Sequence, residues 1–375
     1  MDTNEAKSEM KIYTLTFVIY NYGSILQAFA LQSRLRDFNS EPIVLFPVRK
    51  PRWYLLRKFP QLITLLSILK PRKNYSLYQR FKLKLDNRKF VEKRRKIDVF
   101  KAKNLSIMPV PNIVEFNSSV KPEDVFLAGS DQIWNTLDGN LSPWYSFQWV
   151  KGDNKKYSYA ASIGQSEISE HQKNEYISGL SHLNVLSLRE VQATNIFKSL
   201  FPGKVRQDLD PTLLYDNIFW RKHESPRLIS EPYIFVYMLR PDMNVINLAK
   251  RVAAEKHCRV IYTGVLASDF DGVTTVCDAG IEDFLSYIDN AEVVVTNSFH
   301  GTVFSILFEK PFLSVKLAST SSRVENLLNM TGLASQLVEG TVKTYNLTVD
   351  YTDVQRVLTE ERQKSLDYLK SICRA

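Results

Sequence analysis

The segment from Ala291 to Thr302 constrains the fold more than any other part of the sequence, because two periodicities meet in it. Three consecutive valines, Val293–Val295, are typical of a strand that is buried on both faces. The pair Asn297-Ser298 interrupts the apolar run, and helical spacing begins at Gly301. We therefore expect His300 between the carboxyl end of a strand and the amino end of a helix. Ligands collect at such strand ends in α/β proteins, and the free N–H groups of a helix start favour anions.

His300 is the candidate acid or base at this junction, since an imidazole changes its charge near neutral pH. Its neighbours Asn297, Ser298 and Gly301 are candidate substrate-binding residues. A purely structural histidine is the alternative, and the segment alone leaves both interpretations open. The other four histidines lie in polar segments that do not directly follow a hydrophobic strand: His171, His182, His223 and His257.

The length and the cysteine content exclude several classes of protein. A chain of 375 residues with 44% apolar residues can bury a large core, and its length suggests two domains. Three cysteines without CxxC spacing argue against a disulfide framework or a zinc site and favour a reducing, cytoplasmic compartment. Residues 1–10 are expected to form a disordered tail rather than a signal peptide. No apolar run is long enough to span a membrane.

The order of the predicted elements indicates an α/β fold. A strand at 11–18, a helix from Ile25 and a strand at 43–46 form the opening of a doubly wound domain. This first domain is predicted at 11–212, with an insertion at about 49–104. A linker at 213–232 precedes a second α/β domain at 233–350, and a helix within 351–375 is expected to pack back on the first domain. Further strands are predicted at 124–128, 156–161, 185–188, 233–239, 259–263, 292–296 and 311–315.

Polar residues follow three strands of the predicted first domain. The candidate ligand-binding residues there are Asn21, Tyr22 and Gly23 after the first strand, Ser130 and Asp131 after the strand at 124–128, and Arg189 after the strand at 185–188. The carboxyl ends of parallel strands share one edge, and a guanidinium binds carboxylate or phosphate. Structural alternatives stay open: a tight turn at Gly23, an Asx turn at Asp131, and an ion pair between Arg189 and Glu190. The first turn lacks the GxGxxG spacing, so a dinucleotide is not indicated.

Asp208-Leu209-Asp210 has the Asp-x-Asp spacing that binds a metal and a nucleotide diphosphate in some glycosyltransferases. Pro211 follows immediately, so the segment is better explained as a strand that ends in a linker. We therefore expect no metal site.

Positive charge is concentrated between Arg49 and Lys103. This stretch has 19 Lys and Arg and three acidic residues, a balance of +16 that leaves −7 for the rest of a chain of net charge +9. Residues 53–70 combine aromatics and leucines with flanking cations, which is typical of an interfacial membrane segment, and 82–103 is predicted to be a cationic helix. A solvated insertion is the alternative. Nucleic acid is not an expected partner, because stacking surfaces need aromatics and cations more than leucines.

Short motifs along the chain, taken in order, resemble those of the polysaccharide pyruvyl transferase family between about residues 11 and 330. Each motif alone is weak, but the ordered set is fairly specific, and the basic segment stands among them as an insertion. The matching stretches are Asn21-Tyr22-Gly23 with Leu26-Gln27-Ala28, Gly129-Ser130-Asp131-Gln132-Ile133-Trp134-Asn135, Ser158-Tyr159-Ala160-Ala161-Ser162-Ile163-Gly164, Ser187-Leu188-Arg189-Glu190, Asp210-Pro211-Thr212 and Thr296-Asn297-Ser298-Phe299-His300-Gly301.

The resemblance implies two Rossmann-like domains facing a cleft, as in GT-B glycosyltransferases. It implies a transferase without a cofactor that moves the enolpyruvyl group of phosphoenolpyruvate onto a sugar as a pyruvate ketal and releases phosphate. Arg189 and His300 match family positions near phosphoenolpyruvate, which makes His300 the candidate general acid and Asp131 a candidate base for the acceptor. Many members carry arginine two places before this histidine, where this chain has Ser298. Lys316 or Arg323 would then supply the missing cation.

The implied acceptor is a sugar or lipid-linked oligosaccharide, a precursor of a bacterial cell-surface polysaccharide. Residues 49–104 would hold the protein peripherally on anionic lipid at the inner face of the membrane. Two alternatives are compatible with the same architecture, because fold does not fix function. One is a GT-B glycosyltransferase that uses a nucleotide sugar, and the other is a non-catalytic glycan-binding relative, suggested by Ser298.

Overall fold

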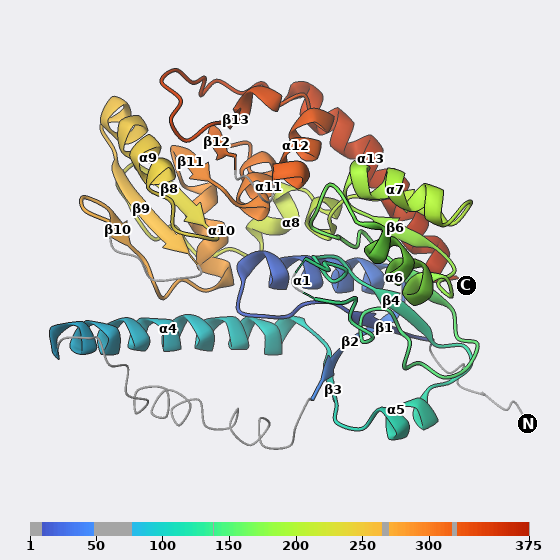
Figure 1. Cartoon of the computed structure of the whole chain (residues 1–375). Coiled ribbons are helices and arrows are strands. Elements are labelled where there is room, and N and C mark those ends of the chain that lie inside the picture. The colour runs from blue at the N-terminus through green and yellow to red at the C-terminus, as the bar shows by residue number, and fades with distance from the viewer. Residues whose placement is uncertain (1–9, 49–76, 138, 265–269, 317–320, 375) are drawn as a thin grey trace, which may run out of the picture.

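The computed structural model describes residues 10–48, 77–137, 139–264, 270–316 and 321–374, with the backbone alone for 77–89 and 321. Two parallel β-sheets, each covered by helices, form the two halves of the molecule (Figure 1). This arrangement confirms the predicted α/β class with two Rossmann-like domains.

The sheet of the first domain has the strand order β3-β2-β1-β4-β5, and every pairing in it is parallel. Two further strands, β6 and β7, continue it through bridges at Tyr157–Val185 and Ala161–Leu188. The strand predicted at 156–161 ends early, because Ala160 has a positive φ of 45° that interrupts the ladder. The strands are β1 (Lys11–Leu15), β2 (Glu41–Pro47), β3 (Ile107–Val110), β4 (Val125–Ala128), β5 (Lys156–Ser158), β6 (Leu186–Leu188) and β7 (Val205–Gln207).

The sheet of the second domain has the order β10-β9-β8-β11-β12-β13 and is also parallel. Its central strands are buried on both faces, which explains their continuous runs of valine, isoleucine and aromatic residues. The strands are β8 (Tyr233–Met238), β9 (Arg259–Gly264), β10 (Thr274–Thr275), β11 (Val293–Thr296), β12 (Phe312–Val315) and β13 (Leu337–Val338).

The helices start at capping residues that are visible in the sequence. Asn21 caps the first helix by accepting a hydrogen bond from the Ser24 N–H at 3.3 Å. This helix therefore begins at Tyr22, three residues earlier than predicted. The helices of the first domain are α1 (Tyr22–Asp37), α4 (Leu77–Asn104), α5 (Ile113–Ser119), α6 (Glu170–Leu180) and α7 (Val191–Leu200). Those of the second are α9 (Met243–Lys256), α10 (Ile281–Asp289), α11 (Phe299–Leu307), α12 (Ser321–Met330) and the short η2 (Ala334–Gln336).

The stretch predicted as a linker, 213–232, is partly a packed element. It contains the end of the 3-10 helix η1 (Pro211–Leu214) and all of α8 (Asn217–Arg221). Leu213, Leu214 and Trp220 are buried, and the Trp220 indole N–H donates to the Thr212 carbonyl at 3.1 Å. Apolar side chains in an otherwise polar stretch give this connection its own contacts with both domains.

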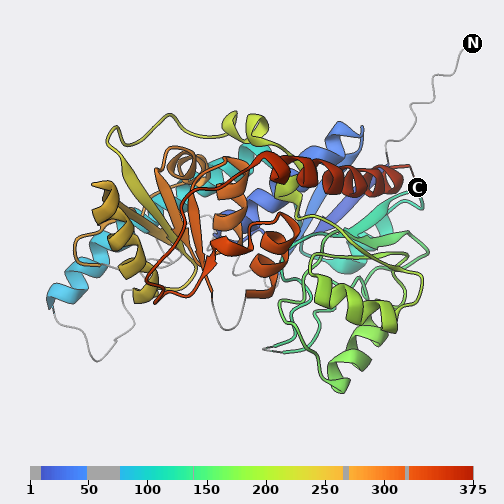
Figure 2. The same ribbon diagram turned by 90° about the horizontal axis from the view of Figure 1, so that it is seen from above.

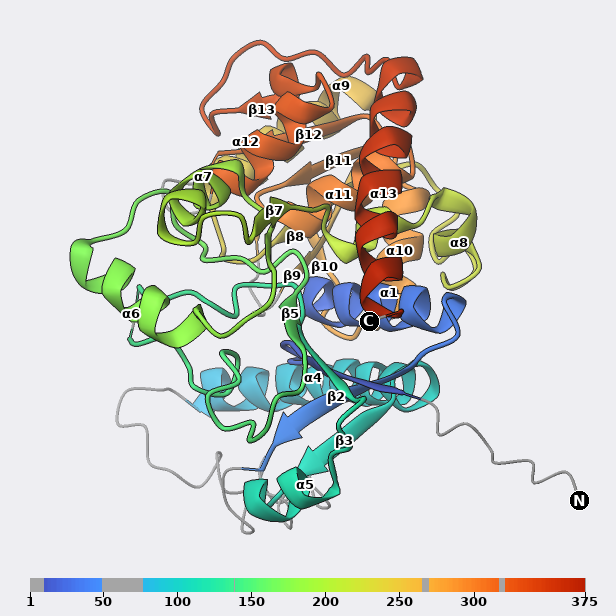
Figure 3. The ribbon, with the colours of Figure 1, turned by 90° about the vertical axis from the view of Figure 1, so that its right-hand side faces the viewer.

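The last helix, α13 (Thr352–Ile372), leaves the second domain and runs back along the first (Figures 2 and 3). The Tyr368 hydroxyl donates to the Ser158 carbonyl at 2.9 Å, and the Ser365 hydroxyl accepts from the Leu209 N–H at 3.1 Å. Arg362 Nε donates to the Leu213 carbonyl at 2.9 Å. The chain thus crosses between the domains twice, which ties them together.

The predicted basic insertion at 49–104 lies only partly within the described residues, since 49–76 fall outside them. The rest forms α4, which lies along both domains (Figure 1). Several of its cations make contacts within the protein: Lys93 donates to the Gly264 carbonyl at 2.8 Å, and Lys96 pairs with Asp283 at 2.7 Å. These two cations of α4 are therefore engaged by the second domain. No helix in the described part of the chain has both the length and the apolar composition to cross a membrane.

Candidate active site

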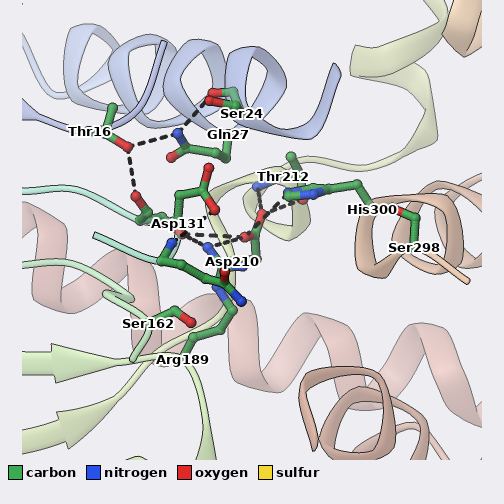
Figure 4. A network of polar contacts seen from close by, with 12 residues as sticks. Thr16, Ser24, Gln27, Asp131, Ser162, Arg189, Asp210, Thr212, Ser298 and His300 are labelled. Atoms are coloured by element: carbon green, nitrogen blue, oxygen red, sulfur yellow. Dashed lines mark hydrogen bonds and ion pairs between the residues drawn. The ribbon is translucent and has the colours of Figure 1, made fainter. Parts of the chain in front are cut away.

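The candidate site lies where the carboxyl ends of the two sheets face each other. The strand order reverses between β1 and β4 in the first sheet and between β8 and β11 in the second. Open α/β sheets bind ligands outside such switch points. Thr16 and Asp131 follow β1 and β4, and His300 follows β11, so residues after both switch points lie around Asp210 (Figure 4).

His300 occupies the second position of α11, the strand-to-helix junction that the sequence predicted. Ser298 caps this helix and accepts a hydrogen bond from the Gly301 N–H at 3.5 Å. Gly301 has no room for a side chain, because a Cβ there would overlap the Thr296 hydroxyl. The imidazole points toward the first domain, and the residue is 7% exposed (Figure 4). The local sequence therefore holds a buried imidazole at the domain boundary.

A buried carboxylate, Asp210, joins the functional candidates of both domains. Its Oδ2 lies 2.9 Å from Arg189 Nη2 and 3.7 Å from His300 Nε2. The second distance is too long for a hydrogen bond but short enough for a charge interaction. Its Oδ1 accepts from the Thr212 N–H at 2.9 Å and the Thr212 hydroxyl at 2.5 Å. Burial alone would raise the pKa of Asp210, but Arg189, His300 and Thr212 outweigh burial and hold the pKa below its ordinary value.

Ser130 connects this carboxylate to the first strands of the chain. Its hydroxyl accepts from Arg189 and donates to Asp210 Oδ2 at 3.3 Å. Its carbonyl accepts from the Thr16 hydroxyl at 2.6 Å, and Gln27 Nε2 donates to that hydroxyl at 2.8 Å. Residues that follow β1, β4, β6 and β7 are thereby joined with Gln27 of α1 in one network (Figure 4). Such a network holds its members in fixed orientations, as a preorganised site requires.

Several buried polar atoms in this region have no hydrogen-bond partner among the described residues. Leaving such a group unpaired costs about 1–3 kcal/mol, so each one calls for an explanation. Donors and acceptors are both represented, which suits a ligand that carries anionic oxygens as well as hydroxyl groups. The atoms are Arg189 Nε and Nη1, His300 Nε2, Glu190 Oε2 and Gln27 Oε1.

A comparison with models of protein families identifies the family of this chain. Residues 21–318 match the family described as polysaccharide pyruvyl transferase. The chain belongs to the polysaccharide pyruvyl transferase family. Membership supports a transferase of polysaccharide biosynthesis in general terms. The search of curated protein sequences found no match.

Solved structures resemble this family member in fold over nearly its whole length. Arabidopsis thaliana UGT89C1 complexed with UDP-L-rhamnose has a TM-score of 0.53 at 10% identity, covering 97% of this chain and 99% of that one. The UDP-N-acetylglucosamine 2-epimerase from Rickettsia bellii has a TM-score of 0.42 at 13% identity, covering 98% and 99%. At 10% identity the likeness to UGT89C1 concerns the fold alone, which is GT-B-like.

The structure adds two residues that the sequence analysis did not propose as site residues. Asp210 was assigned to a possible metal motif, but its carboxylate contacts Arg189, whereas Asp208 accepts from Arg206 at 2.7 Å. The two carboxylates are therefore bound by separate cations. Glu190 was considered only as an ion-pair partner, yet its Oε1 accepts from the Ser162 hydroxyl and its Oε2 is buried without a partner. In the sequence, Glu190 could have been recognised as a site residue from its place in the motif Ser187-Leu188-Arg189-Glu190.

Asp131 lies beside this network, at the end of β4. Its φ of 80° is in the left-handed region, and its Oδ1 accepts from the Gln132 N–H at 2.9 Å. This local contact fits the predicted Asx-type turn. Because Asp131 is only partly buried, its carboxylate can still reach a ligand in the cleft.

The three candidates of the first turn have different placements. Asn21 caps α1, and the Tyr22 hydroxyl donates to the Ala279 carbonyl of the second domain at 2.8 Å. Gly23 faces His300, since a Cβ at this position would overlap the imidazole Nδ1. Gly23 is therefore not the tight turn that the sequence analysis considered. It belongs to the first turn of a helix, and its missing side chain makes room for the histidine.

Asn297 and Ser298 hold the loop that presents His300. Asn297 Oδ1 accepts from the Leu239 N–H at 3.2 Å, and its Nδ2 donates to the Arg240 carbonyl at 3.3 Å. These contacts fix the end of β11 to the end of β8. In this structure the side chains of Asn297 and Ser298 thus hold the loop and the helix start that carry His300.

The two candidates for an additional cation differ in position. Lys316 is exposed and pairs with Glu325 at 3.3 Å. Arg323 is 9% exposed, and its guanidinium lies 5.7 Å from the centre of the Phe299 ring, on which the Arg189 guanidinium also lies, at 5.1 Å. Burial, followed by the nearby charge of Arg189, lowers the pKa of Arg323. Both arginines line a pocket of about 220 Å³ that also has an apolar wall, formed in part by Leu327 and Met330.

Proposed function

We propose that this family member transfers the enolpyruvyl group of phosphoenolpyruvate to two hydroxyl groups of a sugar, forming a pyruvate ketal and releasing phosphate. The observation that carries the proposal is the buried contact of Arg189 and His300 with the single carboxylate of Asp210. Two guanidinium nitrogens of Arg189 have no hydrogen-bond partner among the described residues, which suits the carboxylate or phosphate of the donor. Arg323, on the same aromatic ring, is our candidate for the second cation in place of the arginine that many members carry at Ser298.

The chemistry requires a proton donor, a means to stabilise a cationic carbon, and a proton acceptor. His300 protonates the methylene carbon of the donor, which becomes a methyl group, and Asp210 holds the imidazole for this step. One sugar hydroxyl adds to the neighbouring carbon and loses its proton to Asp131. The C–O bond to phosphate then breaks, and the second hydroxyl takes its place. Of the two hydroxyl protons, one replaces the proton that His300 gave and the other leaves with phosphate.

The test incubates the purified full chain with phosphoenolpyruvate and a panel of free and lipid-linked sugars, and measures phosphate release. Acceptor-dependent release, with a ketal identified by mass spectrometry and NMR, supports the proposal. Turnover of a nucleotide sugar without phosphoenolpyruvate supports a GT-B glycosyltransferase instead. Binding of glycans without turnover of either donor supports a non-catalytic relative.

Variants assign the roles. His300→Ala and Arg189→Ala should each lower turnover by at least roughly a hundredfold, the lower end for a lost acid–base group. His300→Ala should keep the fold, because its side chain lies at the domain boundary rather than in an apolar core. Arg189→Ala leaves the buried carboxylate of Asp210 without the guanidinium that contacts it, so we expect this variant to be less stable as well. His171→Ala is the matched control, since this histidine is exposed on α6. Near-normal turnover by His300→Ala removes the proposed acid, and loss of folding restores the structural interpretation of this histidine.

A further inference from the structure

Helix α4 makes contacts with both domains close to the candidate site. On the first domain, Asp98 Oδ2 accepts from the Tyr20 hydroxyl at 2.8 Å, and the Phe100 ring meets the edge of Phe29 at 5.3 Å. On the second domain, Lys96 Nζ lies 2.7 Å from Asp283 Oδ2. Residues of α4 thus contact α1 and the loop before it in the first domain, and α10 in the second (Figure 1).

Lys93 lies at the centre of this contact and is 4% exposed. Its Nζ donates to the carbonyl of Gly264, at the carboxyl end of β9, at 2.8 Å. The same ammonium lies 4.2 Å from the centre of the Tyr22 ring. The attraction between an ammonium and an aromatic face is stronger when the ammonium is desolvated, so this contact fixes the start of α1 against the second domain.

Tyr22 is held from several directions. The Phe284 ring stacks on it at 4.4 Å with an interplanar angle of 11°, so the tyrosine ring lies between an aromatic ring and the Lys93 ammonium. The hydroxyl donates to the Ala279 carbonyl at 2.8 Å. Tyr22 belongs to the first domain, whereas Phe284 and Ala279 belong to the second. The Tyr22 side chain therefore joins the two domains, and the Lys93 ammonium covers one face of its ring.

The next residue in the chain, Gly23, forms a wall of the His300 site. The backbone at Gly23 lies so close to the imidazole that a Cβ would overlap Nδ1. The first turn of α1 and the first turn of α11 come from different domains, so their separation depends on how the domains are held. A small change in the position of Tyr22 therefore changes the space that the imidazole occupies.

We propose that Lys93 is a positioning residue, which sets the orientation of His300 through Tyr22 and Gly23 and so makes α4 a clasp across the domain boundary. The proposal rests on the proposed function only in taking His300 as the proton donor. It gives the part of the basic segment in α4 a role inside the enzyme that does not depend on lipid.

The test replaces Lys93 by methionine, which keeps the length of the side chain and removes its charge. We expect turnover to fall roughly tenfold to a hundredfold, as for a reacting group displaced by about 1 Å, with little change in the KM for phosphoenolpyruvate. Lys93→Arg, which keeps the charge, should restore most of the activity. Arg95→Met is the matched control on the same helix, since Arg95 is exposed and, within the described part of the chain, pairs with its neighbour Glu92 alone. It should behave as the wild type.

A second readout does not need catalysis. The imidazole signals of His300, assigned by their loss in His300→Gln, should shift in NMR spectra of Lys93→Met and stay in place in Arg95→Met. If the chain fails to transfer pyruvyl groups, this shift still tests the clasp. Unchanged His300 signals in a folded Lys93→Met protein would overturn the proposal. Should Lys93→Met not fold, Lys96→Met loosens the same clasp at Asp283, and unchanged His300 signals in that variant overturn it equally.

Discussion

At the residue scale, the candidate site depends on one carboxylate. Asp210 is fully buried, yet its pKa is held below the ordinary value because Arg189 and His300 approach the same oxygen from two domains. An isolated buried carboxylate would be costly, and a partner removed from such a pair leaves an uncompensated charge. Asp210 therefore lies between Arg189 of the first domain and His300 of the second, which links the candidate acid to the contact between the domains.

Gly23 gives a prediction that depends on a single methyl group. In Gly23→Ala the new Cβ would overlap His300 Nδ1, and the imidazole ring has to move because the α1 backbone is fixed. We expect turnover to fall by about tenfold or more. The melting temperature should fall as well, because the overlap reaches the imidazole Cγ and the ring is buried. Gly139→Ala is the control, because a Cβ at that position meets no atom of the described residues within 4 Å. Wild-type turnover by Gly23→Ala would show that the imidazole position is not critical.

At the scale of elements, the connection between the domains contains an unusual carboxyl group. Glu224 follows α8, and its Oε2 is buried without a partner among the described residues. Burial, and then the nearby charge of Asp289, raise the pKa of Glu224 from 4.5 to about 7, although Arg221 opposes the shift. Arg221 itself forms a bidentate pair with Asp289 at 2.8 and 2.9 Å. Arg221 therefore pairs with Asp289 rather than with Glu224.

This shift predicts how stability depends on pH. The folded protein keeps a proton on Glu224 that the unfolded chain loses above about pH 4.5, so this contribution to stability is complete below pH 4.5 and is lost as the pH rises through about 7. Glu224→Gln should abolish that loss. Between pH 4.5 and 8 the free energy of unfolding of the variant, relative to that of the wild type, should rise by about 1 kcal/mol after discounting for solvent screening. Denaturant unfolding at both pH values measures it. Parallel pH profiles of the two proteins would contradict the shift.

At the scale of the whole molecule, the net charge of +9 arises from the basic segment, about half of which, 49–76, lies outside the described residues. We propose that this segment holds the enzyme on anionic lipid, near a lipid-linked acceptor. Each cation near such a surface is worth about 1 kcal/mol before salt screening. We expect the protein to bind vesicles that contain anionic lipid and to be released as salt rises, as cosedimentation would measure.

The matched variant replaces five cations of the segment by glutamine. It should bind vesicles more weakly and keep its activity on a soluble sugar acceptor. A wild-type protein that ignores anionic vesicles at low salt would identify the segment as a solvated insertion. A variant that also loses activity on the soluble acceptor would assign the cations to the active site. The positions are Arg57, Lys58, Lys70, Arg72 and Lys73.

The sequence by itself determined the features that arise from neighbouring residues. The valine run before Ser298 specifies a buried strand followed by a capped helix, so the position of His300 at the junction could be predicted. The parallel sheets followed from strands that alternate with helices. The polar residues at strand ends, Ser130 and Arg189 among them, could be predicted to share one edge, because parallel strands end on the same side.

Only the tertiary structure decided which of these groups meet and which cations are buried. Asp210, Arg323 and His300 come from elements far apart in sequence, and periodicity reports on neighbours along the chain alone. Gly23 looked like a turn because its reason for being glycine, the imidazole of His300, belongs to the other domain. Lys93 looked like part of a solvent- or lipid-facing helix for the same reason: its acceptor, the Gly264 carbonyl, is provided by the approach of the second domain. A charge pattern gives the number of cations on a helix, but their burial depends on what the rest of the chain packs against them.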